Sequence, residues 1–326
     1  MTDPVRDAVA VLVAQRTAAM PHAPPALVEA VATREVQQAA DAGGLVLADD
    51  RAVVGEWLDA DAWCGEPTRH RIVGWRHGDN AARRRVEQAL GTLGAPPSTL
   101  LLLDRPCAGL APTLRAHGLQ VDSVVLVGET ATARAALGPV PDVAGVRVRP
   151  GHAADAEAVV RLQRETFTEN PDPCWFGANA AWLEALRRDW IREADGGDGV
   201  VLVVEDADGF AGFAQGGPAR DGRWGHTAGL SLVLAPRVRG RGVSRVLHAR
   251  LLDGLIDRGV RWFNGGTSNP AVLYRARRMG RRPMAWVWRV RPPHPPDRFG
   301  PFAIDRYVDG DPDQGASLGG SASTRW

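Results

Sequence analysis

The stretch that decides the fold runs from Trp224 to Ser244 and reads W-G-H-T-A-G-L-S-L-V-L-A-P-R-V-R-G-R-G-V-S. Residues 229–234 have the composition of a strand, Ala235 and Pro236 end it, and an amphipathic helical pattern begins at Val243. A glycine-rich loop that feeds a helix start aims free backbone N–H groups at one place, where the helix dipole adds partial positive charge. The stretch therefore predicts a phosphate-binding loop.

This loop differs from two common nucleotide-binding loops. It contains no G-K-[ST] sequence, and the chain has no lysine at all. It is also not a G-x-G-x-x-G loop followed by an acidic residue about 20 positions further on. A P-loop and a Rossmann dinucleotide fold are therefore disfavoured.

The pattern Arg237-x-x-Gly240-x-Gly242 resembles instead the pyrophosphate loop of the GNAT superfamily of acyl-CoA N-acyltransferases. Further along the chain, Asn269-Pro-Ala-Val-Leu-Tyr274 and Gly280 resemble the family signature N-x-x-(A)-x-x-Y…G. The sequence departs from the family at Arg281, where an aromatic residue is common. The resemblance covers roughly residues 145–292.

The resemblance implies that acetyl-CoA or a longer acyl-CoA is the co-substrate and that no metal takes part. Pantetheine would lie along an exposed strand edge where pairing breaks near Leu232 and Val233, with a main-chain N–H aimed at the thioester oxygen. The pyrophosphate would lie against the loop, where Arg237 or Arg239 reaches phosphate oxygens or, alternatively, belongs to a solvated cluster. The expected coenzyme-binding residues are Leu232, Val233, Leu234, Arg237, Val238, Arg239, Gly240, Arg241, Gly242, Val243, Ser244 and Asn269.

Two residues are the expected catalytic groups of such a transfer. His226 lies eleven residues before Arg237, where the family often places its general base, more commonly a glutamate. A neutral imidazole accepts a proton readily near pH 7. Tyr274 would protonate the departing thiolate. The competing interpretations are a strand-end histidine that bonds to solvent and a tyrosine that packs in a helix interface.

Aromatic residues gather between Phe167 and Trp190, a region that lies over the acceptor cleft in the family. They indicate a large, partly apolar acceptor or acyl chain. The alternative is helix packing, because Trp182 and Trp190 are eight residues apart and so share a helix face. The expected substrate-contacting residues are Trp175, Phe176 and Trp182.

The order of predicted elements occurs twice along the chain. At an offset of 162 residues, Gly118 matches Gly280 and Leu101 matches Phe263, and helix, breaker, strand, helix, glycine, strand recurs. The first copy has no Arg-x-x-Gly-x-Gly, and Pro112 falls opposite Tyr274. We therefore expect an α/β protein, more specifically an α+β mixed sheet, with two GNAT-like domains. Each would have a central, mostly antiparallel sheet flanked by helices, and the first would be degenerate.

Length and composition predict the domain organisation and the cellular compartment. The 326 residues predict a first domain at 1–140, a catalytic domain at 145–292 and an unpacked tail at 293–326 rich in Pro, Gly, Ser and Asp. No apolar run or leader indicates a membrane or export, and the three separated cysteines indicate neither disulfides nor a zinc site. A cytoplasmic protein is expected, and a monomer is plausible because the two domains can pair internally.

The function predicted from these residues is direct transfer of an acyl group from acyl-CoA to a primary amine of a small molecule or antibiotic-like natural product. Acetyl is the default group and a longer chain is a variant. The alternatives are a protein N-acetyltransferase and a non-catalytic acyl-CoA-binding or scaffolding protein. Residues 145–292 carry more basic than acidic residues, but no basic helix interleaved with aromatics supports a nucleic-acid partner.

Overall fold

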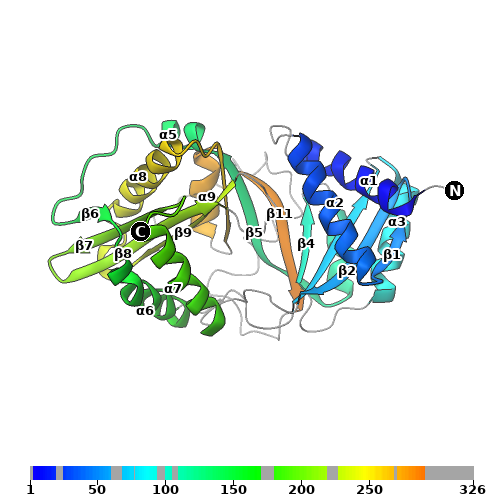
Figure 1. Cartoon of the computed structure of the whole chain (residues 1–326), viewed down its shortest axis with the longest axis horizontal. Helices are drawn as coiled ribbons and strands as arrows, with labels where there is room; N and C mark the ends of the chain where they lie inside the picture. The colour runs from blue at the N-terminus through cyan, green and yellow to red at the C-terminus, as the bar shows by residue number, and fades with distance from the viewer. Residues whose placement is uncertain are drawn as a thin grey trace, which may run out of the picture. The chain divides into compact units, whose positions relative to one another are not determined.

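The computed structural model describes residues 3–19, 25–59, 68–76, 78–93, 100–104, 109–169, 180–218, 227–267 and 270–290. Within them the chain forms two compact units (Figure 1). The first unit contains residues up to Val125 together with residues 283–290, and the second contains the described residues from Leu126 to Arg282. The predicted domain boundaries stay a prediction, and the predicted tail lies outside the described residues.

The first unit begins with two helices that cover a three-stranded antiparallel sheet of order β1-β2-β3. Leu12 and Val36 from the helices pack against Val53 and Ile72 of the sheet. A second group of strands in this unit has the order β4-β11-β5, with β4 antiparallel to β11. The elements are α1 (Pro4–Ala19), α2 (Pro25–Asp41), β1 (Leu45–Ala48), β2 (Ala52–Asp59), β3 (Thr68–Trp75), α3 (Asn80–Leu93), β4 (Leu100–Asp104), α4 (Ala111–Ala116), β5 (Leu119–Glu129) and β11 (Arg282–Val290).

The second unit is built on a sheet of order β6-β7-β8-β9-β10, with the end of β5 next to β10. Its pairs are antiparallel from β6 to β9, and β9 is parallel to β10. The elements are α5 (Thr130–Leu137), β6 (Arg147–Pro150), α6 (Ala156–Glu169), α7 (Ala180–Ala194), β7 (Val200–Asp206), β8 (Gly209–Pro218), β9 (Thr227–Leu234), α8 (Val243–Asp257), β10 (Trp262–Thr267) and α9 (Pro270–Arg278).

Alternating side chains divide the core of the second unit between the two faces of this sheet. Leu202 of β7 packs with Leu247 of α8 on one face. Val203, the next residue, packs with Leu162 of α6 and Trp190 of α7 on the other. Because side chains of a strand alternate between faces and both faces are covered, β7 and β8 have nearly continuous apolar sequences. The predicted mixed α/β class with mostly antiparallel sheets is confirmed.

The predicted duplication is confirmed in the order of elements. Two helices, three strands, helix, strand, helix and strand occur as α1 to β5 and again from α6 to β11. The glycines that align in the repeat, Gly118 and Gly280, both have positive φ, at 77° and 75°. The helix α5, which lies between the two copies, was not predicted.

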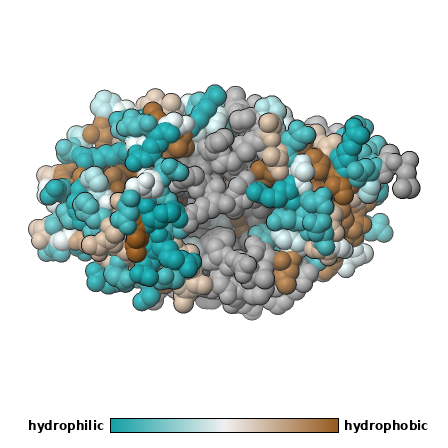
Figure 2. Space-filling model, in the orientation of Figure 1, coloured by the Kyte–Doolittle hydropathy of each residue, from teal (hydrophilic) through white to brown (hydrophobic). Residues whose placement is uncertain are grey.

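The surface drawn in Figure 2 is mainly hydrophilic over the described residues of each unit, with hydrophobic residues in small groups. Large apolar side chains that are exposed include Val46, Leu58, Ile256 and Val272. Such scattered residues are normal for a folded surface. In the part of the chain that the structure describes, no helix is long and apolar enough to cross a membrane.

Close packing between Gly151 and Trp190 leads to a test of this core. A Cβ atom on Gly151 would lie 2.4 Å from Cζ2 of the fully buried Trp190. We expect Gly151→Ala to lower the free energy of unfolding by about 1–3 kcal/mol, because the rigid indole cannot move without disturbing its neighbours. Chemical denaturation measures the change.

The matched control is Gly217→Ala on β8, where the nearest atoms lie 3.7 Å from the added Cβ. That distance is ordinary van der Waals contact, so the control should unfold like the parent protein. Equal stability of the two variants would contradict the packing described for Trp190.

Candidate functional site

The two parallel strands at the centre of the second unit separate after a short pairing. β9 pairs with β10 at Thr227, Ala228 and Gly229, opposite Trp262, Phe263 and Asn264. Its antiparallel pairing with β8 continues to Leu234, the last residue of the strand. Within the described strands, no pair joins residues 230–234 of β9 to β10. This edge of β9 therefore carries main-chain groups that are available to an extended ligand.

The loop after β9 leads directly into the helix α8. A short 3-10 helix spans Pro236–Val238, and Gly240 and Gly242 then adopt φ of 76° and 87°. Gly242 is the N-cap residue of α8 and has no side-chain cap. Left-handed backbone at both positions favours glycine, since a side chain would be strained there. The loop and the helix start thus have the predicted form.

The N–H groups at this turn have no acceptor within the described part of the protein. Backbone hydrogen bonds resume at Arg245 and Val246, whose N–H groups donate to Gly242 O. Among the described residues, the N–H groups from Gly240 to Ser244 make no backbone hydrogen bond of good geometry. Together with the positive end of the α8 dipole they form a site suited to a phosphate.

The arginines of the loop hold its shape through polar contacts within the second unit. Arg237 donates to Asp206 at 2.8 Å and to Phe210 O at 2.7 Å, which ties the loop to the β7–β8 hairpin. The hydrogen bond from Arg237 lowers the pKa of the Asp206 carboxyl. Nε of Arg239 donates to Leu234 O at 2.8 Å, and Nη2 of Arg241 donates to Ala144 O at 2.8 Å.

The first turn of α8 is held by two further basic residues that sequence reasoning missed. Nδ1 of His248 donates to Ser244 O at 3.0 Å, which leaves Nε2 unprotonated in the neutral ring. Nη1 of Arg275, from α9, lies 3.3 Å from the Ser244 hydroxyl oxygen. Burial, with the cations Arg281 and Arg275, lowers the pKa of His248 to about 4. The spacing of four residues from Ser244 to His248 is the sequence signal that places both on one helix face.

Arg281 is a buried cation beside the point where β9 and β10 separate. It is 7% exposed, and its Nη2 donates to Leu126 O at 3.2 Å and to Gly265 O at 3.3 Å. Its guanidinium lies 4.9 Å from the ring centre of Phe263. Burial lowers the pKa of Arg281 to about 10, so it stays charged near neutral pH. Arg281, at the position where the family commonly has an aromatic residue, is therefore a core arginine in this protein.

Tyr274 lies on α9 and is 63% exposed. The guanidinium carbon of Arg278 is 5.9 Å from its ring centre. Of its neighbours along the helix, Leu273 and Ala276 are buried, so α9 packs through these residues and presents Tyr274 outward. The structure thus leaves the phenol accessible to a ligand.

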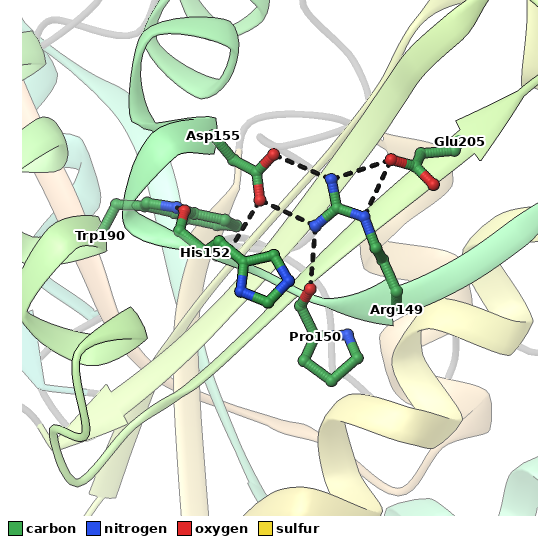
Figure 3. A network of polar contacts seen from close by, with 6 residues as sticks. All are labelled: Arg149, Pro150, His152, Asp155, Trp190 and Glu205. Carbon is green, nitrogen blue, oxygen red and sulfur yellow. Dashed lines mark hydrogen bonds and ion pairs between the residues drawn. The ribbon is translucent and has the colours of Figure 1, made fainter.

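A polar network fixes the start of α6 on the opposite face of the sheet (Figure 3). Arg149 of β6 donates to both carboxylate oxygens of Asp155, at 2.8 and 2.9 Å, and to Glu205 of β7 at 2.8 Å. Asp155 also accepts the His152 N–H, and Trp190 Nε1 donates to His152 O at 2.9 Å. The hydrogen bonds from Arg149 lower the pKa of Asp155. This network determines where α6 begins over the sheet.

Of the other predicted site residues, some pack in the core and some lie outside the residues that the structure describes. Val233, Leu234, Val238 and Val243 are buried, whereas Leu232 is partly buried. Trp182 packs against the core cluster beneath α6 and α7. His226, Asn269, Trp175 and Phe176 lie outside the described residues. Among the residues that are described, no group of three or more His, Cys, Asp or Glu gathers as metal ligands.

Comparison with known proteins matches residues 156–280 to a family model described as the acetyltransferase (GNAT) family. A GCN5-related N-acetyltransferase from Sphaerobacter thermophilus has a similar structure, with a TM-score of 0.51 and 16% identity over 89% of this chain and 95% of that chain. A tandem GNAT protein from the clavulanic acid biosynthesis pathway has a TM-score of 0.44 and 13% identity, over 88% and 96%. No curated protein sequence gives a significant match.

The environment of His248 predicts a pH dependence of stability. The pKa of His248 is about 4 in the folded protein, below the usual value of 6.5. As the pH falls, this histidine is therefore protonated in the unfolded chain before it is protonated in the folded protein. The stabilisation is complete above pH 6.5 and is lost as the pH falls toward 4, at up to about 1.4 kcal/mol per pH unit. Urea denaturation at pH 7, 6, 5 and 4.5 measures this loss.

We expect His248→Gln to remove this part of the acid sensitivity, because glutamine does not titrate. The matched control is His117→Gln, which changes an exposed histidine of the first unit. This variant should keep the acid sensitivity of the parent protein. Parallel pH profiles for the parent protein and His248→Gln would contradict the assignment.

Proposed function

Because residues 156–280 match the model of the acetyltransferase (GNAT) family, we propose that the chain transfers an acyl group from acyl-CoA to a primary amine. The observation that carries the proposal is the row of N–H groups from Gly240 to Ser244 without an acceptor among the described residues, next to a strand edge that pairs with no described strand. The first feature fits a pyrophosphate and the second an extended pantetheine arm.

The two features follow one another along the chain. The phosphate-binding turn follows β9, and the open edge of β9 extends from Leu234 back to Leu230. At about 3.3 Å per residue that edge is about 13 Å long. The thioester of a coenzyme held at the turn would then reach the point where β9 and β10 separate. The Ala235 N–H donates to Ala211 O next to β8, and main-chain groups alternate along a strand, so the N–H of Val233 is directed to β8 and that of Leu232 faces the open edge. The Leu232 N–H would donate to the thioester oxygen as it becomes an oxyanion.

In the proposed reaction the amine nitrogen bonds to the thioester carbonyl carbon and the C–S bond breaks. His226 takes the proton that the amine loses, directly or through water, and Tyr274 gives a proton to the departing thiolate. His226 is the residue before β9, which begins at Thr227. The exposure of Tyr274 on α9 supports its access to the coenzyme. Asn269 would hold the coenzyme at the start of that helix.

The acceptor in this proposal is a small molecule with a primary amine, and acetyl is the default acyl group. Trp175, Phe176 and Trp182 are the proposed contacts to a bulky acceptor or a longer acyl chain. Trp182 lies on α7, on the face of the sheet that α6 also covers. Acyl-CoA would approach from the α8 face and the acceptor from the α6 face. We propose a cytoplasmic setting for this chemistry.

Thermal shifts with CoA thioesters from acetyl to decanoyl test the coenzyme site. A ligand at 100 times its Kd should stabilise the protein by about 2.7 kcal/mol.

We expect Gly242→Ala to weaken coenzyme binding by at least about tenfold, because a Cβ would occupy the phosphate-facing side of the turn and strain its φ of 87°. Calorimetric titration of each protein with CoA gives the affinities.

The matched control is Gly259→Ala, after the other end of α8. Gly259 has φ of 72° and, like Gly242, has open space around its Cβ position. Both variants should lose similar stability, but only Gly242→Ala should lose coenzyme affinity. An unshifted melt with every thioester would overturn the coenzyme proposal.

The catalytic roles are tested by release of CoA thiol across a panel of amines. We expect His226→Gln to lower kcat by about 10²- to 10⁴-fold, since the general base is removed. Tyr274→Phe should lower kcat at least about tenfold without weakening CoA binding. His117→Gln serves as the histidine control and should leave the rate unchanged. Thioester binding with unchanged thiol release in both variants would show these catalytic roles to be wrong.

A further inference from the structure

Two polar side-chain atoms on α6 are buried without a hydrogen-bond partner. Gln163 is only 4% exposed, and its Oε1 accepts no hydrogen bond in the structure as described. Oγ1 of Thr166, one turn further along, is buried and unpartnered in the same way. Residues three apart lie on one helix face. Buried polar groups normally have partners, so such a pair marks a place where a water molecule or a ligand would supply the hydrogen bonds.

Two polar residues of the sheet lie on the face that α6 covers. Gln215 of β8 pairs directly across with Ser231 of β9. By strand alternation their side chains lie on the same face as Phe213 and Val233, which pack against α6. Both are half buried. The α6 face of the sheet therefore changes from apolar to neutral polar at these two positions.

The fixed start of α6 brings the two polar pairs to the same level. Ala156 at that start packs in one cluster with Ala235, which follows β9. α6 then packs along β8 and β9. At about 1.5 Å per residue, Gln163 and Thr166 lie about 11 and 15 Å along the helix from Ala156. At about 3.3 Å per residue, Ser231 lies about 13 Å along the chain from Ala235.

This position adjoins the proposed reaction site. β9 leaves β10 after Gly229, so Ser231 is the second residue of the separated edge. Three carboxylates of this part of the unit are already engaged: Asp155 and Glu205 bond to Arg149, and Glu193 bonds to Arg192 and to the Gly199 N–H. The four neutral side chains supply hydroxyl and carboxamide groups, which donate and accept hydrogen bonds without favouring a charge.

We propose that Gln163, Thr166, Gln215 and Ser231 form the acceptor subsite and select a hydroxyl-bearing primary amine, of the amino-sugar or amino-alcohol class. This inference rests on the proposed acyl transfer. Neutral donors and acceptors match hydroxyl groups that flank an amine. They give no ion pair to a polyamine, and an aryl amine without hydroxyl groups would leave their polar atoms unpaired.

The test compares D-glucosamine with spermidine, benzylamine and trialanine as acceptors for acetyl-CoA. D-Glucosamine should give the highest kcat/KM. Thr166→Val and Gln163→Met keep the side-chain volume and remove the polar atoms. Each should raise the KM for D-glucosamine at least about tenfold, leave the KM for acetyl-CoA unchanged, and leave the melting temperature equal or higher, because an unpaired buried polar group is removed.

The matched controls are Thr132→Val on α5 and Gln37→Met on α2, both of which are exposed side chains. Saturation-transfer NMR of D-glucosamine with CoA present gives a readout that needs no turnover. Binding to the parent protein that is lost in Thr166→Val and Gln163→Met supports the subsite even if transfer is absent. The subsite is overturned if D-glucosamine binds equally to the parent protein and to both α6 variants, or binds to none of them. A preference for spermidine, benzylamine or trialanine as acceptor also overturns it. Failure to bind any CoA thioester overturns the proposed function instead.

Discussion

The separation of β9 from β10 is the constraint on which the rest of the second unit depends. Parallel pairing ends at Gly229 and Asn264, yet β9 remains paired with β8 up to Leu234. The strand is thus held in place from one side and open on the other. The two cores on either face of the sheet keep this arrangement rigid, because Leu234 packs toward α8 while Val233 packs toward α6.

Arginine side chains position the loop and the helix α8 that follow this open edge. Arg237, Arg239, Arg241 and Arg275 bridge the loop and α8 to carbonyl, carboxylate or hydroxyl oxygens of neighbouring elements. A guanidinium offers several donors in a fixed plane, so one side chain can join two segments. In the proposed function, phosphate binding falls to main-chain N–H groups of the same loop, which these contacts hold in place.

Much of this could be predicted from the sequence, because the relevant signals are local. Gly240 and Gly242 mark a glycine-rich loop, Pro236 ends the strand, and the apolar pattern from Val243 marks the helix. The partners of His248 and Arg281 could not be predicted in this way. Their environment depends on segments far apart in the chain, such as Leu126 and Gly265 around Arg281. Gln163 and Thr166 lie in a sequence typical of an amphipathic helix, and only the tertiary fold makes their polar atoms buried.

The position of β11 has a consequence for how the protein is made. This strand comes from the second copy of the repeat but lies between β4 and β5 in the first unit. A ribosome synthesises the first copy long before β11, so the β4-β11-β5 sheet cannot close until translation has passed residue 290. The long sequence separation between these strands also makes their assembly slow. The two copies are therefore coupled in folding, and cutting the chain between them would leave the first unit without its central strand.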